Sequence, residues 1–315
     1  MHRGKNQKVL KSTESVRNRN RKRDGGTMSN REVTKIRQNS PMKDIWRRLK
    51  KNKLALLGLA TLLIIFVMAV FAPLIIPYDY AAQNYEHRLE FPSRDHWLGT
   101  DNFGRDIFSR IVYGSRYTLV IGFGCITVSA IIGSILGALA GFFPAFDNII
   151  MRFTDVVMAI PIFTLNISII AALGKGIENM MIAMTITNIP MFIRIVRARV
   201  MTIREQEFIE AARAIGASDF RILVKHIMFN SLAPIIIQFT LGAGTIILWA
   251  ASLSFIGLGV QPPTPEWGLM ISAGRTYLRD YWYISIFPGL AIVMITYALN
   301  LLGDGLRDAM DPRLK

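Results

Sequence analysis

Apolar residues along this chain are gathered into six long runs separated by polar connections. The runs cover residues 54–76, 119–143, 153–173, 177–196, 232–255 and 284–302. A helix of about twenty residues crosses the roughly 30 Å hydrocarbon core of a bilayer. The pattern therefore predicts an all-α membrane protein with about six transmembrane helices.

The first run is too long for a signal peptide, whose apolar stretch is about 7–15 residues, and no small-residue cleavage site follows it. We expect it to remain as an anchor. The fourth run is the weakest, because Asn188, Pro190 and Arg194 interrupt it.

The polar connections divide the chain into four parts. These are a basic tail at 1–53, a first helix with an outer connection at 54–116, a five-helix core at 117–303 with a long inner connection at 197–231, and a carboxyl-terminal tail at 304–315. We expect the basic tail to be disordered. With the amino terminus inside, the inner segments hold 29 Lys and Arg residues and the outer segments 8. The positive-inside rule then predicts that both termini are cytoplasmic.

Charge and composition add little to this picture. The net charge is +15, but 18 of the 37 basic residues precede Leu54 in the polar tail, where they orient the first helix and can touch anionic lipid. We therefore expect a lipid bilayer rather than a nucleic acid as partner. The single cysteine, Cys125, excludes an intrachain disulfide, and the four histidines are scattered without metal-ligand spacing, so no metal site is predicted.

Small residues and prolines in the runs indicate how the helices pack. Gly133, Gly137 and Gly141 share one helix face, which favours close approach of another helix, either within the chain or from a second copy. Prolines at 161, 190, 234 and 288 should kink or start helices, either lining a cavity or accommodating packing.

The sequence lacks the residues that would energise transport by this chain alone. The runs contain almost no ionisable residue; Asp155 is expected to pair with Arg152, and Arg194 to extend to the surface. No phosphate loop of the form GxxxxGK[ST] is present, since Gly174-Lys175-Gly176 has the wrong spacing. We expect a non-catalytic subunit without a cofactor, driven by a partner and paired with a similar subunit.

The inner connection carries Glu210-Ala211-Ala212, followed three residues later by Gly216. This resembles the EAA loop of importer-type ABC permeases, and those four residues match its pattern. In the later part of the pattern, this sequence differs from the family at His226, Met228 and Phe229.

The residues of this loop suit a docking helix. An apolar contact stripe is predicted for Phe208, Ile209, Ala212 and Ile215. Gly216 permits a tight turn, and Glu210 can pair with a basic residue across a contact. An amphipathic surface helix joining two spans would explain the same spacing.

Three further segments extend the resemblance. Residues 96–116, 251–268 and 301–315 are similar to the C-type permease subunits of dipeptide and oligopeptide importers, and the second permease of nickel importers is similar too. The resemblance covers residues 54–315 and implies the type I ABC importer fold, with a five-helix core and an added N-terminal helix.

By this resemblance, the chain is a permease subunit of a peptide importer in a bacterial cytoplasmic membrane. It implies a second permease, two ATPases that use ATP and Mg²⁺, and an extracytoplasmic substrate-binding protein as partners. The EAA loop would couple the ATPases to the pathway. Polar and aromatic residues of the outer connections would either contact these partners or fold over the membrane surface: Trp97, Asp101, Arg105, Asp106 and Trp267.

Two alternatives remain open at this point. One is an importer of nickel or another small solute, for which His87 and His96 offer weak support. The other is an ion-coupled transporter working alone, which the lack of intramembrane charge disfavours.

Overall fold

A computed structural model describes residues 41–311 of the chain. The chain divides into a unit that ends at Asp44 and a compact unit, Ile45–Lys315, which contains all the features discussed below. Most of the predicted basic tail lies outside the described residues, but its last part forms helix α2 (Pro41–Leu49), so the predicted disorder does not extend through residue 53.

Among residues 41–311, five helical segments are long and apolar enough to cross a membrane, and the number is six if a bent pair of helices forms one span. The five are α3 (Lys53–Val70), α5 (Ile107–Phe142), α8 (Ile177–Arg204), the continuous segment Asp219–Phe255, and α13 (Tyr283–Met310). The segment Asp219–Phe255 joins α10 (Asp219–Arg221), the π-helical η3 (Ile222–Met228) and α11 (Phe229–Phe255). The predicted all-α membrane fold is confirmed.

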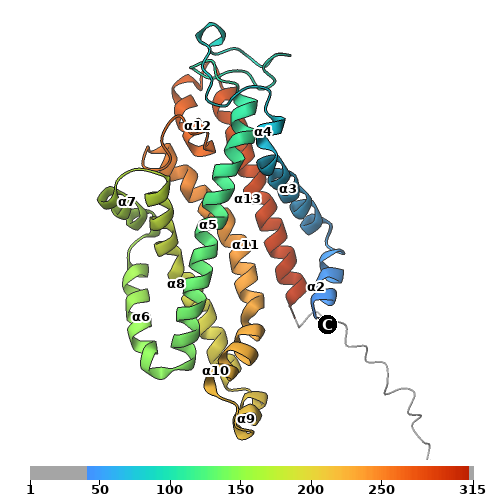
Figure 1. Cartoon of the computed structure of the whole chain (residues 1–315), viewed down its shortest axis with the longest axis vertical. Helices are drawn as coiled ribbons and strands as arrows, with labels where there is room; N and C mark the ends of the chain where they lie inside the picture. The colour runs from blue at the N-terminus through green and yellow to red at the C-terminus, as the bar shows by residue number, and fades with distance from the viewer. Residues whose placement is uncertain (1–40, 312–315) are drawn as a thin grey trace, which may run out of the picture. The chain divides into compact units, whose positions relative to one another are not determined.

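Short helices cap the two ends of the bundle. These are α4 (Ala72–Ile75), η2 (Tyr85–His87), α9 (Glu207–Ala214), α12 (Trp267–Gly274) and η4 (Arg275–Tyr277). In Figure 1, α9 lies at the lower end of the bundle, and the loops of residues 77–106 lie at the upper end, near α12. We call residues 77–106 the 77–106 segment.

Helix α5 begins twelve residues earlier than the apolar run predicted, at Ile107 rather than 119. Asp106 starts it as the N-cap, with its carboxylate accepting a hydrogen bond from the Ser109 N–H at 2.7 Å. The predicted boundary at 116 therefore falls inside this helix. Its first turns were hidden by Arg110, which is buried and donates to the Tyr80 carbonyl at 2.8 Å.

The third predicted span, 153–173, is broken rather than continuous. Helices α6 (Pro144–Ala159) and α7 (Ile162–Leu173) meet at an angle of 92°. Pro161 stands at the break, where it lacks an N–H, and the preceding Ile160 adopts the extended backbone that a following proline favours. By contrast, the other three prolines lie inside continuous helices, at positions 190, 234 and 288.

The glycine stripe of α5 packs against α8 within the same chain. A Cβ atom added at Gly133 would lie 2.5 Å from Cβ of Phe192, and one at Gly137 would lie 2.6 Å from the Ile193 carbonyl oxygen. Such contacts are too short for a side chain, so the glycines allow the two backbones to approach. Of the two predicted uses of the stripe, the structure shows packing within the chain.

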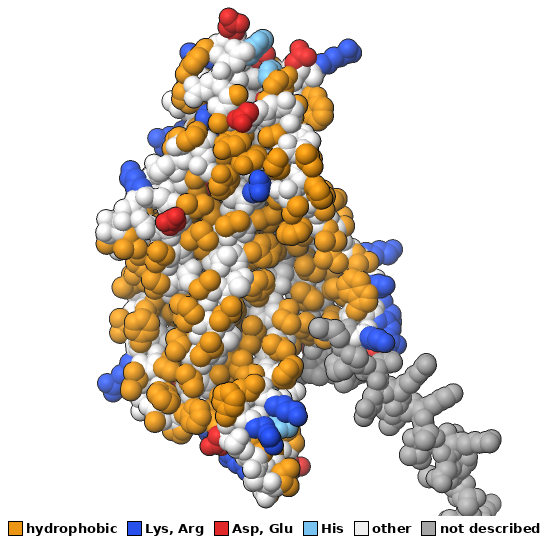
Figure 2. All heavy atoms as spheres, viewed as in Figure 1, with side chains coloured by type: hydrophobic (Ala, Val, Ile, Leu, Met, Phe, Trp, Pro, Cys, Tyr) orange, Lys and Arg blue, Asp and Glu red, His pale blue; other side chains and the backbone are white. Residues whose placement is uncertain are grey.

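Helix α13 continues to Met310, so most of the predicted carboxyl-terminal tail is helical. Figure 2 shows hydrophobic side chains covering the middle of the visible face, with charged side chains mainly toward its two ends. Large apolar side chains of the predicted spans, such as Leu63 of α3 and Ile131 of α5, are more than half exposed, as a lipid-facing surface requires.

Candidate functional site

Helix α9 is attached to the bundle by its inner face. Ile209 is completely buried and Ala212 is 8% exposed. Both belong to a hydrophobic cluster that includes Phe142 of α5, Val200 of α8 and Ile227 of η3. The position of α9 is thus tied to the ends of three other helical segments.

The outer face of α9 and the turn that follows it are apolar and uncovered. Phe208 is 42% exposed, Ile215 85% and Phe220 75%. The predicted four-residue stripe is therefore wrong as a single surface. Phe208 and Ile215, seven residues apart, share the outer face, whereas Ile209 and Ala212, three apart, share the buried one.

A tight turn ends α9 at Gly216, as the sequence predicted. Gly216 has φ of +84°, a conformation in which a residue with a Cβ is strained. Its N–H donates to the Arg213 carbonyl at 2.9 Å, and the Ala217 N–H donates to the Ala212 carbonyl at 3.0 Å. This Schellman arrangement turns the chain directly into α10, whose N-cap is Ser218.

Glu210 and Ala211 are exposed beside this apolar surface. Within residues 41–311, no hydrogen bond or ion pair holds the Glu210 carboxylate, so it is available to a basic group of another chain. We call Phe208, Glu210, Ala211, Ile215 and Phe220 the α9 surface.

A cavity of about 340 Å³ lies beside the break between α6 and α7, against α8 and α11. Its polar lining comes from uncharged side chains, including Asn188, Gln238 and Thr245, and the rest is mainly apolar. Such a lining offers hydrogen-bonding groups to a solute, and the lining itself carries no fixed charge.

Ion pairs join α6 to α8 and differ from the predicted pairing. Asp155 pairs with Arg194 at 2.6 Å, not with Arg152. One turn further along α8, Arg197 forms a bidentate ion pair with Asp147. Two of its guanidinium nitrogens lie 2.5 and 2.7 Å from the two carboxylate oxygens. The partners come from a crossing helix, which the spacing along one helix could not reveal.

Most of the predicted contact residues of the outer connections are buried within this chain, which favours the second of the two alternatives, that they fold over the membrane surface. The Asp101 carboxylate accepts a hydrogen bond from the Arg105 side chain at 2.7 Å. It also accepts hydrogen bonds from the backbone N–H groups of Phe103 and Arg105. Trp267 is 1% exposed and donates to the Ile111 carbonyl at 3.0 Å.

Asp106 is also buried, as the N-cap of α5. Four of the five residues therefore hold the fold together, and only Trp97, 61% exposed, has substantial free surface.

Glu266 is a buried carboxylate that the sequence did not single out. It is 1% exposed and caps α12, where it accepts hydrogen bonds from the N–H groups of Gly268 and Leu269, both at 2.9 Å. Burial raises the pKa of Glu266 above its ordinary value, and the two backbone hydrogen bonds oppose that rise.

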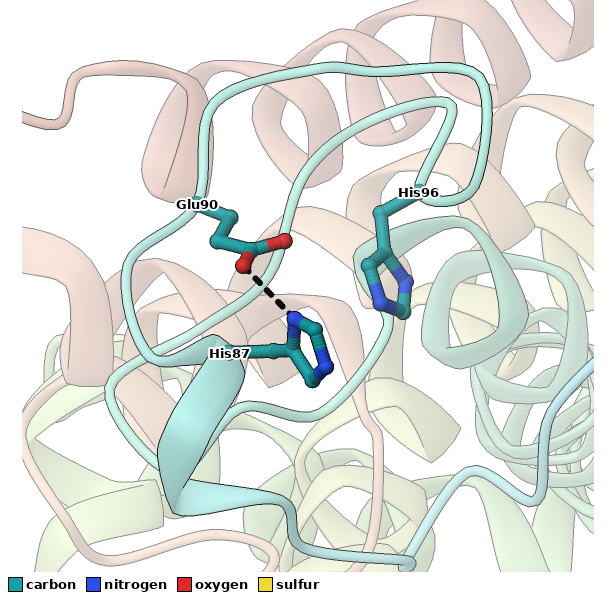
Figure 3. Close-up of side chains that lie close together, drawn as sticks. All are labelled: His87, Glu90 and His96. Carbon is teal, nitrogen blue, oxygen red and sulfur yellow. Dashed lines mark hydrogen bonds and ion pairs between the residues drawn. The ribbon is translucent and has the colours of Figure 1, made fainter.

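The 77–106 segment brings together His87, Glu90 and His96, which looked scattered in the sequence (Figure 3). Each offers a ligand atom, and these atoms lie within 4.8 Å of one another. The predicted absence of metal-ligand spacing therefore does not describe the folded segment. The H-x-x-E spacing of His87 and Glu90 was the signal in the sequence that could have indicated the cluster.

Comparison with known proteins places these features in a family. A family model described as the binding-protein-dependent transport system inner membrane component matches residues 129–315. A second, described as the N-terminal TM domain of oligopeptide transport permease C, matches residues 40–92.

Individual relatives match over most of their length. The dipeptide transport system permease protein DppC of Alkalihalophilus pseudofirmus is 48% identical, over 88% of this chain and 91% of the relative. The glutathione transport system permease protein GsiD of Escherichia coli O6:K15:H31 is 44% identical, over 88% and 92%.

A solved structure shares the fold. A chain of the MetNI methionine ABC transporter, seen in inward facing conformations, superposes with a TM-score of 0.54 at 20% identity. The match covers 65% of the present chain and 98% of the other. At this identity it bears on the fold alone, and it agrees with the ABC importer permease fold expected from the sequence.

Proposed function

Because this chain belongs to the family of binding-protein-dependent transport system inner membrane components, and is thus a non-catalytic multi-pass permease subunit of an ABC importer, we propose that it carries dipeptides and similarly small peptides. The relatives named for dipeptide and glutathione transport support the peptide assignment over nickel or another small solute. Family membership removes the ion-coupled alternative.

The α9 surface is the proposed contact with an ATPase subunit. The observation that carries this proposal is the division of α9 into a buried face, Ile209 and Ala212, and an uncovered apolar face with Phe208 and Ile215. Exposed isoleucine and phenylalanine on a protruding turn favour burial against a partner. The inner face would pass a displacement of α9 to the ends of α5 and α8.

The cavity between α6, α7, α8 and α11 supports passage of varied peptides. Its uncharged polar side chains, such as Asn188 and Gln238, can satisfy peptide N–H and C=O groups of any sequence. Since no charge in the lining selects among peptide side chains, selection falls to an extracytoplasmic binding protein. One such chain supplies half of the pathway, and a homologous permease the other half.

The complete assembly in this proposal has two permeases and two ATPases in a bacterial inner membrane. ATP and Mg²⁺ are used by the ATPases, and this chain binds neither. The α9 end of the bundle faces the cytoplasm together with both termini, in agreement with the excess of basic residues in the connections on that side.

Co-purification of the full chain from its native membrane in mild detergent tests the coupling. Glu210→Lys should release the ATPase subunits while retaining the second permease. Glu86→Lys, a charge reversal at an exposed glutamate of the 77–106 segment, is the matched control and should retain both. Full retention of the ATPases by Glu210→Lys, with normal uptake, would contradict the proposed contact.

Uptake by the reconstituted transporter tests the substrate. ATP-dependent accumulation of a labelled dipeptide, with its cognate binding protein, is expected to exceed that of Ni²⁺. Accumulation of Ni²⁺ without dipeptide uptake would favour the nickel alternative.

A further inference from the structure

Two imidazoles and one carboxylate converge in the 77–106 segment, at the end of the bundle away from α9 (Figures 1 and 3). His87 lies at the end of the turn η2, Glu90 follows three residues later, and His96 comes from the next loop. In Figure 3 the Glu90 carboxylate and the two rings face a common space. Nδ1 of His87 lies 2.6 Å from Oε1 of Glu90.

His96 is held in place by contacts that leave one ring nitrogen for a ligand. It is 9% exposed, and its Nδ1 lies 3.0 Å from Oδ1 of Asp106. The ring of Tyr78 packs against it, with 4.8 Å between the ring centroids. A carboxylate on one nitrogen of an imidazole is the usual way in which proteins orient a metal-binding histidine, with Nε2 directed to the ion.

Thr100 fixes the backbone that carries the other two groups. Its hydroxyl donates to the His87 carbonyl and accepts a hydrogen bond from the Glu90 N–H at 2.9 Å. The Thr100 N–H in turn donates to the Glu90 carbonyl at 3.0 Å. The main chain at His87 and Glu90 is thus positioned by contacts that do not involve the candidate ligand atoms.

The set of donors selects a class of ion. Imidazole nitrogens and a carboxylate suit divalent first-row transition ions such as Zn²⁺, whereas Mg²⁺ and Ca²⁺ prefer oxygen ligands alone. Ligands about 2.0–2.1 Å from a tetrahedral ion are about 3.3 Å apart. The widest separation here, 4.8 Å, would need to close by roughly 1.5 Å, which a partly exposed side chain can supply by rotation.

Space remains beside the cluster for further ligands. A cavity of about 710 Å³ is lined by all three residues together with Asn84, Ser93 and Asp95. Three protein ligands and an open side are the arrangement in which a metal ion keeps a water or binds an external donor.

We propose that His87, Glu90 and His96 form a binding site for one divalent transition-metal ion of the Zn²⁺ class. The ion would connect the turn at residues 85–90 to the loop that carries His96, with its remaining coordination position open to the cavity. None of the three residues lines the cavity beside the break between α6 and α7, and none belongs to the α9 surface.

Calorimetric titration of the full-length chain with ZnCl₂ tests the site, using protein purified in detergent through a tag without histidine. One Zn²⁺ per chain is expected. His87→Gln and His96→Gln should each weaken binding at least tenfold, while His226→Gln, a histidine next to α9, should leave it unchanged. Since the His87 side chain is 47% exposed, its substitution does not threaten folding.

A positioning role for Asp106 can be separated from its role as helix cap. Asp106→Asn retains a capping oxygen for α5 but removes the charge beside His96, and about tenfold weaker Zn²⁺ binding is expected. X-ray absorption at the zinc edge should show nitrogen and oxygen ligands near 2.0–2.1 Å.

Absence of saturable Zn²⁺ binding by the wild-type chain would overturn the proposal. So would binding that survives both histidine substitutions, or equal competition by Mg²⁺, which would indicate an ordinary carboxylate surface.

Discussion

Ile209 and Ile215 stand six residues apart on the same short helix and its cap, yet the first is completely buried and the second is 85% exposed. The buried one joins α9 to α5, α8 and η3, and the exposed one lies in the α9 surface. We therefore expect Ile209 to contribute to the stability of the chain and Ile215 to contribute to partner binding.

Truncation of these two isoleucines is expected to give opposite results. Ile209→Ala should destabilise the chain by about 3 kcal/mol, because it leaves a cavity in a packed cluster. Ile215→Ala should change stability by less than about 0.5 kcal/mol and weaken ATPase binding roughly tenfold. Thermal unfolding in detergent and ATPase pull-down measure the two effects; the reverse assignment would contradict the division of α9.

Gly216→Ala should destabilise the end of α9 by about 1 kcal/mol. The glycine has φ of +84°, and a Cβ added there meets no atom within 4 Å, so the cost comes from backbone conformation and not from a clash. Faster amide hydrogen exchange at residues 214–218 is the expected signature. Gly216→Asn should be milder, since asparagine tolerates this conformation better.

Gly137→Ala should loosen the packing of α5 on α8, because its Cβ would lie 2.6 Å from the Ile193 carbonyl oxygen. We expect a lower melting temperature and reduced transport. Gly244→Ala is the matched control, as its Cβ would meet side chains only at 3.5 Å and beyond, which is ordinary contact. Equal effects of the two substitutions would argue against close backbone approach at Gly137.

The buried Glu266 should make stability depend on pH. Its pKa in the folded chain lies above the ordinary value of 4.5, so its stabilising contribution is complete below about that pH and is lost as the pH rises through the raised pKa. Relative to Glu266→Gln, the wild-type chain should therefore lose melting temperature between acidic and neutral pH. A difference that grows in the opposite direction would contradict a raised pKa.

The long apolar runs in the sequence predicted where the spans lie. The structure shows why some helix boundaries were not predicted. The start of α5 was not predicted because Arg110 is typical of a surface connection in the sequence. In the structure it is buried, and it donates hydrogen bonds to carbonyl groups distant in sequence. The bend at Pro161 could be foreseen as a kink, but its 92° angle depends on the neighbouring helices.

The candidate sites differed in how far local spacing determines them. Gly216 was predictable because its role is local to one turn. The two faces of α9 were not separated, since the neighbours that bury Ile209 come from α5, α8 and η3. Likewise, His87 and His96 meet only through the fold of the 77–106 segment.

The early start of α5 has a mechanical consequence. Its 36 residues form a rod of roughly 54 Å, longer than the hydrocarbon core. Phe142 at one end belongs to the cluster that holds Ile209, and Asp106 at the other end contacts His96. A displacement of α9 would thus be transmitted to the opposite side of the membrane through one continuous helix, without passing through a loop.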